Sequence, residues 1–155
     1  MVEILVTLVL IATALLGTAG LQAYALQVSK SGESRTQAVF MASDIAERME
    51  ANKAQAILGS YAIASTSSVT SPATMCDAAV CDPVSLANWD IWQWGSLILA
   101  NRGIPQATWS ITATGTNPIA YSIKINWVDR RSKTTYATPG SGEPMSYTTS
   151  RTIRN

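Results

Sequence analysis

The sequence predicts an α+β fold in which one long N-terminal α-helix packs on a C-terminal antiparallel β-sheet. No charged residue lies between Glu3 and Lys30, so the chain of 155 residues opens with a long apolar run. A stretch with helical periodicity follows this run. In the last third of the chain, apolar and polar residues alternate as they do in half-buried strands. The length suits one domain with an appendage.

The composition excludes several classes of function. The chain has no histidine and two cysteines, which excludes His-based triads, histidine metal ligands and a four-cysteine zinc site. Charged residues make up 14 % of the chain, compared with about 25 % in an average soluble domain. The net charge of +1 gives no overall field that favours nucleic acid or an acidic partner. We expect no enzymatic activity, no cofactor and no metal.

The uncharged run from Ile4 to Ser29, here called the apolar segment, has 26 residues and no proline. As an α-helix it would extend roughly 39 Å, and a bilayer core is about 30 Å thick. The segment can therefore cross a membrane. A cleavable secretory signal would start with basic residues and have a shorter apolar stretch. Two further structures would produce such a run, a plain single-pass anchor and the buried helix of a soluble protein.

Glu3 distinguishes among these kinds of helix. A carboxylate in an apolar helix costs about 2.5–3.5 kcal/mol at the centre of a membrane span and less near its end. A plain anchor has no use for it, whereas a helix that packs beside similar helices can pair it with a neighbour's cation. Gly17 and Gly20 each weaken the helix by about 1 kcal/mol relative to Ala. They predict close helix packing or a segment that melts locally during assembly.

The opening MVEILVTLVLI, residues 1–11, resembles the N-terminus of type IV pilins and type II secretion pseudopilins. In those proteins a prepilin peptidase removes a short leader, and a glutamate lies close to the new N-terminus. Glu3 matches this glutamate. The pattern usually places two further residues before Met1, so we expect the leader, its cleavage glycine and the methylated N-terminal residue to lie outside this sequence.

A second resemblance narrows the family. Residues 41–54 (MASDIAERMEANKA), residues 59–61 (GSY), residues 82–83 (DP) and residues 86–89 (LANW) resemble the minor pilins called PilV. This resemblance implies the type IV pilin fold and a non-enzymatic filament subunit in which Glu3 neutralises the N-terminal amine of the adjacent subunit. A major pilin and a minor type II secretion pseudopilin are competing interpretations, and a membrane-anchored periplasmic binding module or enzyme is a competing interpretation of a different class.

The resemblance also implies partners and a location. Other minor pilins, the major pilin and a tip adhesin are the implied partners, with prepilin peptidase acting during maturation. The subunit would wait in the inner membrane with a periplasmic head and end in the pilus fibre at the cell surface. No small-molecule substrate is implied.

We divide the chain into three parts. Residues 1–29 form the membrane or fibre-core half of the N-terminal helix, residues 30–60 its amphipathic half, and residues 61–155 a globular head. In the amphipathic half one helical stripe contains Ala38, Met41, Ala42, Ile45, Met49 and Ala56. The whole helix would be one rod of roughly 55 residues and about 80 Å. Gly59 is placed to end it.

The first part of the head predicts a loop and a second helix. Residues 65–74 (STSSVTSPAT) have the composition of a loop. The spacing of Cys76 and Cys81 is too wide for a CxxC redox motif, and we expect a structural disulfide formed in an oxidising compartment such as the periplasm. Asp82-Pro83 predicts the start of a helix over 84–101, ended by Gly103 and Pro105. Tryptophans in this helix could bind sugars or bases, but core packing is their commoner use. They are Trp89, Trp92 and Trp94.

The alternation of apolar and polar residues predicts strands at 109–114 and 121–127, joined by a turn at 115–118. A short strand at 134–136, a Pro/Gly loop at 139–144 and a strand near 146–153 would complete an antiparallel meander packed on the amphipathic helix. Basic residues cluster at Arg130, Arg131 and Lys133. We expect a solvated hairpin turn there rather than a nucleic-acid site, because three charges give only a shallow salt dependence.

Overall fold

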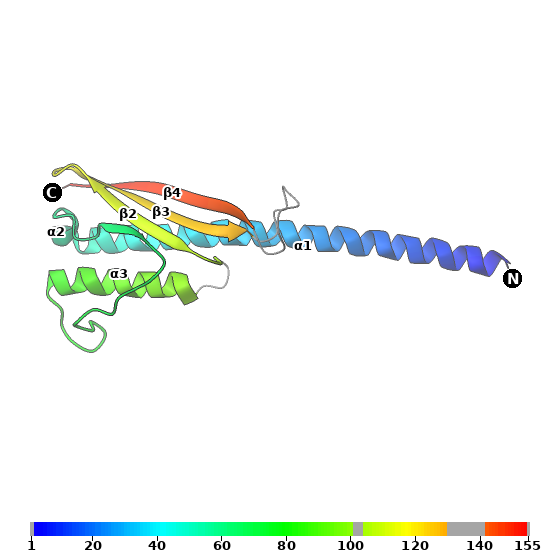
Figure 1. The fold of residues 1–155 in the computed structure, drawn as a ribbon, viewed down its shortest axis with the longest axis horizontal. Coiled ribbons are helices and arrows are strands. Elements are labelled where there is room, and N and C mark those ends of the chain that lie inside the picture. The colour runs from blue at the N-terminus through cyan, green and yellow to red at the C-terminus, as the bar shows by residue number, and fades with distance from the viewer. Residues whose placement is uncertain (1, 101–103, 130–141, 155) are drawn as a thin grey trace.

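The computed structural model describes residues 2–100, 104–129 and 142–154. Its elements in chain order are α1 (Val2–Ala51), α2 (Lys53–Ala56), β1 (Ile63–Thr66), α3 (Pro83–Ala100), β2 (Thr108–Thr114), β3 (Ile119–Asp129) and β4 (Glu143–Ile153). Figure 1 shows α1 as a rod whose C-terminal half carries the sheet and α3, while its N-terminal half projects away from them. The predicted α+β class is confirmed, and the arrangement is consistent with the type IV pilin fold.

The predicted single rod is interrupted near its end. α1 stops at Ala51, because the backbone of Asn52 leaves the helical region with φ −108° and ψ 52°. The Asn52 side chain is buried, and its Nδ2 donates a hydrogen bond to the carbonyl oxygen of Pro83 at 2.7 Å. This contact with the start of α3 satisfies a buried amide at the position where the helix breaks.

Gly59 ends the helical region, as predicted. The N–H of Ser60 donates to the carbonyl of Gln55 at 3.2 Å, and the N–H of Gly59 donates to the carbonyl of Ala56 at 3.1 Å. These two bonds form a Schellman motif, which places its C′ residue in the left-handed region. Gly59 occupies that position with φ +81°, a conformation that favours glycine.

The sheet has four antiparallel strands in the order β1-β2-β3-β4. The part from β2 to β4 is an antiparallel meander, as predicted, and the turn between β2 and β3 contains Gly115 at φ +84° and a cis Asn117–Pro118 bond. The expected loop at 139–144 is wrong at its end, because Glu143 and Pro144 lie in β4 and pair directly with Asp129 and Val128 of β3. The strand β1 was not predicted. Ser65 and Thr66, expected in a loop, lie in β1. Their strand conformation depends on pairing with β2, a contact distant in sequence that local composition does not reveal.

The core lies between α1, α3 and the inner face of the sheet. Most residues of the predicted stripe on α1 are buried, and they face β3, β4 and α3. α3 adds Trp94 and Ile98, and alternate residues of β2 and β3 complete the core. These strand residues are Trp109, Ile111, Ile119, Tyr121, Ile123, Ile125 and Trp127. The small side chains of Ala38 and Ala42 let the other elements approach α1 closely.

The helix predicted over 84–101 is observed as α3, with Pro83 at its first position. Several other expectations fall on residues that the structure does not describe. These are the end of the second helix at Gly103, the basic residues Arg130, Arg131 and Lys133, the strand at 134–136 and the first part of the loop at 139–144.

Candidate assembly surface on the N-terminal helix

The first half of α1 exposes its apolar side chains on every face. Each residue from Val2 to Lys30 is exposed, and Leu16 keeps 74 % of its surface open. α1 is long and apolar enough to cross a membrane, and no part of its most apolar 18-residue window is buried within the chain. A helix that is apolar all round needs lipid or other protein to cover it.

The threonine hydroxyl groups in this part of α1 are satisfied within the helix. Thr7, Thr13 and Thr18 each donate a hydrogen bond of 2.9 Å to the backbone carbonyl three residues earlier. An unsatisfied polar group in a bilayer core costs several kcal/mol, roughly 4–8 for transfer into a medium that cannot hydrogen-bond. These threonines therefore add little cost to burial of the helix in lipid or among other helices.

Glu3 lies in the first turn of α1 and is exposed. The positive end of the helix dipole favours a carboxylate there by about 0.3–1 kcal/mol. Within residues 2–100, 104–129 and 142–154, no basic side chain forms an ion pair with Glu3. Lys30 follows 27 positions later, roughly 40 Å along the helix, and pairs instead with Glu33 at 2.7 Å. A basic partner for Glu3 has to come from another molecule or from outside the described residues.

Gly17 and Gly20 lie within the continuous helix of α1. A Cβ atom at either position would meet nothing within 4 Å. The contacts described within this chain therefore do not require glycine at either position. The close packing or local melting predicted for this segment concerns the assembled state and stays a prediction.

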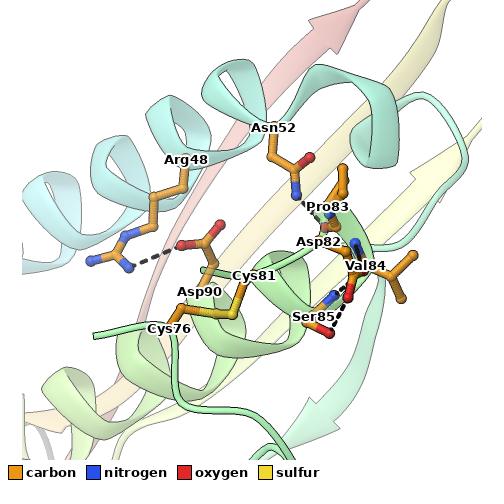
Figure 2. Close-up of a disulfide and its surroundings, with 9 residues drawn as sticks. All are labelled: Arg48, Asn52, Cys76, Cys81, Asp82, Pro83, Val84, Ser85 and Asp90. Carbon is orange, nitrogen blue, oxygen red and sulfur yellow. Dashed lines mark hydrogen bonds and ion pairs between the residues drawn. A yellow bond between two sulfur atoms is a disulfide. The ribbon is translucent and has the colours of Figure 1, made fainter. Parts of the chain in front are cut away.

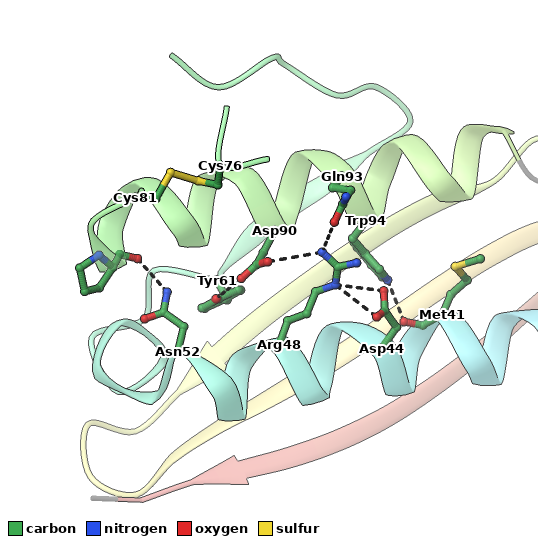
Figure 3. A network of polar contacts seen from close by, with 11 residues as sticks. Met41, Asp44, Arg48, Asn52, Tyr61, Cys76, Cys81, Asp90, Gln93 and Trp94 are labelled. Carbon is green, nitrogen blue, oxygen red and sulfur yellow. Dashed lines mark hydrogen bonds and ion pairs between the residues drawn. A yellow bond between two sulfur atoms is a disulfide. The ribbon is translucent and has the colours of Figure 1, made fainter. Parts of the chain in front are cut away.

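A polar network attaches α3 to the other half of α1 (Figure 3). The guanidinium of Arg48 lies between Asp44 on its own helix, at 3.1 Å, and Asp90 of α3, at 3.4 Å. It also donates to the side-chain oxygen of Gln93 at 2.6 Å. The hydroxyl of Tyr61 donates to the other oxygen of Asp90 at 2.6 Å, so the buried carboxylate of Asp90 is held from two sides.

This environment raises the pKa of the Tyr61 hydroxyl well above its usual range, first because the side chain is buried and second because it donates to Asp90. Burial also raises the pKa of Tyr121, whose hydroxyl donates to the carbonyl of Ala56 at 2.6 Å. Both tyrosines act as neutral hydrogen-bond donors that fix the end of the helical region against α3 and the sheet.

A second link between α1 and α3 involves tryptophan. The indole nitrogen of Trp94 donates to the backbone carbonyl of Met41 at 2.7 Å, and its ring meets Trp109 edge-on with centroids 6.2 Å apart. Core packing is confirmed for Trp94 and for Trp89, which are buried. Trp92 is only half-buried and lies against Trp89, with centroids 4.9 Å apart.

The predicted disulfide is present at the N-terminal end of α3 (Figure 2). Cys76 and Cys81 are bonded, with their Cα atoms 5.5 Å apart. The next residue, Asp82, caps α3, because its carboxylate accepts hydrogen bonds from the backbone N–H groups of Val84 and Ser85 and from the Ser85 hydroxyl. The hydroxyl bond is the main reason that the pKa of Asp82 is lowered. The disulfide closes the loop that leads directly into this cap.

Three of the predicted site residues, Glu3, Gly17 and Gly20, share the exposed part of α1, whereas the disulfide belongs to the opposite end of the molecule. The network around Arg48 was not predicted from the sequence. Its local part, the spacing of Asp44 and Arg48, is visible in the sequence. The contact between the two helices could have been suspected from Asp90, because a carboxylate beside three tryptophans in an apolar helix requires a hydrogen-bond or ion-pair partner. Within the described residues, no group of three or more His, Cys, Asp or Glu side chains could hold a metal ion.

Comparison with known proteins gives one finding. A family model described as Tt1218-like, type IV pilin Tt1218, matches residues 20–92, just under half of the chain. The match runs from the apolar segment through β1 and the disulfide into α3. No curated protein and no solved structure matched the chain. The family match supports a type IV pilin-like protein, and with the apolar helix it supports a structural subunit that is anchored in a membrane and ends in a pilus.

Proposed function

We propose that this chain is a minor type IV pilin of the PilV kind, which joins other minor pilins to prime and assemble the pilus tip. The observation that carries the proposal is the contrast between the two halves of α1. The first half exposes apolar side chains on all faces, and the second half is built into the core of a folded head. A subunit of this shape can be held by lipid first and by neighbouring helices later.

In this proposal the three parts of the chain have separate tasks. Residues 1–29 anchor the subunit in the inner membrane and then enter the fibre core. Residues 30–60 join this segment rigidly to the head, residues 61–155, whose surface meets other minor pilins, the major pilin and a tip adhesin. Prepilin peptidase prepares the N-terminus before assembly.

Glu3 sets the axial position of the subunit. Its carboxylate forms no ion pair with the described residues, and the neighbouring subunit would supply the cation in the form of its N-terminal amine. In an apolar fibre core an unpaired carboxylate is strongly unfavourable, so positions that leave Glu3 unpaired are rejected. The pair therefore specifies alignment more than it adds stability.

The test is Glu3→Gln, with Glu47→Gln as the matched control on the exposed surface of the same helix. We expect Glu3→Gln to insert into the inner membrane normally, and to be reduced at least tenfold in sheared fibres and in pull-downs with other minor pilins. Glu47→Gln should behave as the wild type. Normal incorporation of Glu3→Gln would refute the role of the charge.

Copy number distinguishes a minor pilin from a major pilin and from a pseudopilin. In purified fibres a minor pilin is a trace component, whereas a major pilin is the bulk of the protein. A pseudopilin would instead be required for type II secretion and be absent from surface pili. Quantitative mass spectrometry of sheared fibres, with deletion strains assayed for piliation and secretion, separates these three outcomes.

A further inference from the structure

We propose that a groove between β1 and α3 binds a neutral saccharide. The groove has a volume of about 650 Å³ and is bordered by β1, the segment that follows it and one face of α3. The inference goes beyond the proposed function and does not depend on it, because it concerns the surface of the head and not the N-terminal helix.

The groove has a preformed wall. In the segment after β1, the Ser68 N–H donates to the Thr66 hydroxyl oxygen at 3.1 Å, which fixes a tight turn. Val69 then packs against Gly95 of α3. A Cβ atom on residue 95 would overlap Cγ1 of Val69 and would lie 3.1 Å from Cζ2 of Trp109. Glycine at this position therefore lets the segment lie against α3 and shape one side of the groove.

The lining carries no charge. All of its residues are uncharged, and the polar groups of its side chains are hydroxyls, the amide of Asn88 and tryptophan indole N–H groups. The side chains of Ser65, Thr70, Ser71 and Asn88 form no hydrogen bond with another described residue, so their donors and acceptors are available to a ligand. An anionic or cationic ligand would find no counter-charge here.

The groove also has an aromatic surface. Trp92 lines it together with Ile91, is half-buried, and is supported by Trp89 from the same helix. A pyranose ring has an apolar face of C–H groups and a rim of hydroxyls. The Trp92 ring can stack on the apolar face of the sugar, and the serine and threonine hydroxyls and the Asn88 amide of the groove can form hydrogen bonds with its rim. A hydrophobic ligand would leave these polar groups without partners.

An added peptide strand is the competing occupant, because β1 lies at one edge of the sheet. The structure disfavours it. β1 has four residues, and its pairing with β2 is irregular between Ile63 and Thr66. Strand addition relies on a regular row of free backbone groups, which so short and irregular an edge does not offer.

The experiment uses the full chain in lipid nanodiscs, because maltoside and glucoside detergents would themselves compete for the groove. The probes are maltotriose, cellotriose and triacetylchitotriose, with sialyllactose as an anionic comparison. Saturation-transfer NMR detects binding, and titration of tryptophan fluorescence gives the Kd. We expect saturable binding of at least one neutral trisaccharide. Asn88→Ala should weaken it about fivefold to tenfold through loss of one or two hydrogen bonds.

Trp92→Leu should weaken binding further, with a thermal unfolding scan to show that the head remains folded. Thr148→Ala, on an exposed position of β4 outside the groove, is the matched control and should bind as the wild type. The proposal is overturned if no neutral probe saturates, if sialyllactose binds more tightly than all of them, or if Asn88→Ala leaves the affinity unchanged. It is also overturned if the groove variants impair only the capture of other pilins, which would assign the groove to a protein contact.

Discussion

The guanidinium of Arg48 on α1 lies 3.4 Å from the carboxylate of Asp90 on α3, although the two residues are 42 positions apart in the sequence. The carboxylate is buried and has only Arg48 and the Tyr61 hydroxyl as side-chain partners among the described residues. This pair fixes α3 along α1, and through α3 it fixes the disulfide loop that precedes that helix.

Removing the cation should be more damaging than removing both members of the pair. Arg48→Met leaves the buried Asp90 without its cation, and we expect a loss of about 2–3 kcal/mol in the free energy of unfolding. Arg48→Met combined with Asp90→Asn should recover part of this loss. Urea unfolding followed by tryptophan fluorescence measures both variants. Equal stability of Arg48→Met and the wild type would show that the pair does not hold the two helices.

Alkaline pH should destabilise the head through its buried tyrosines. The pKa values of Tyr61 and Tyr121 are raised in the folded state, so above about pH 10 the unfolded chain loses protons that the folded chain retains. Stability is therefore fully present below that pH and falls above it, by up to about 1.4 kcal/mol per pH unit for each tyrosine.

The measurement is the free energy of unfolding between pH 8 and pH 11. Above pH 10, the free energy of unfolding should fall less steeply with pH in Tyr121→Phe than in the wild type, by the amount that corresponds to about one proton. A slope that is the same for Tyr121→Phe and the wild type would contradict the assignment.

Gly17 and Gly20 should matter for assembly and not for the folded subunit. A Cβ at either position meets nothing within 4 Å in this chain, and Ala favours an isolated helix by about 1 kcal/mol per position. We expect Gly17→Ala/Gly20→Ala to insert and fold normally, and to enter fibres several-fold less efficiently. Thr18→Ala, in the same segment, should assemble as the wild type. If the double variant also assembled normally, neither close packing nor local melting at these glycines would be needed.

The disulfide should stabilise the entry into α3. Closing a loop with a sequence separation of 5 contributes about 2 kcal/mol in the chain-entropy description. Cys76→Ser/Cys81→Ser should lower the free energy of unfolding by this amount, measured from the fluorescence of the buried Trp94. The reduced wild type should match the variant. No difference between the oxidised and reduced chains would show that the Asp82 cap alone fixes this end of α3.

Local patterns in the sequence were sufficient for the elements whose structure depends on local physics. The stripe on α1, Gly59 at the end of the helical region, Asp82-Pro83 at the start of α3 and the alternation in β2 and β3 were all predicted. Each depends on helical or strand periodicity, or on a cap formed by adjacent residues.

The features that were missed depend on contacts between distant residues. β1 forms in a Ser/Thr-rich stretch because β2 pairs with it. The helix breaks at Asn52, where the side-chain amide donates a hydrogen bond to the carbonyl oxygen of Pro83. Position 95 requires glycine because a larger side chain would overlap Val69. None of these has a local signature. For the assembly surface, the sequence predicted the exposed residues, but the described residues contain no ion-pair partner for Glu3 and nothing that covers the apolar segment.

The most direct test of the account is in vivo photo-crosslinking from Leu16, the most exposed large apolar residue of α1. A photoreactive amino acid at this position should give cross-links to the helices of other pilins in sheared fibres, in addition to lipid adducts in the membrane fraction. The same amino acid at the fully exposed Val80 is the comparison, because it reports on the disulfide loop instead. If Leu16 cross-linked only to lipid in every fraction, the helix would be a plain anchor and the assembly role would be wrong.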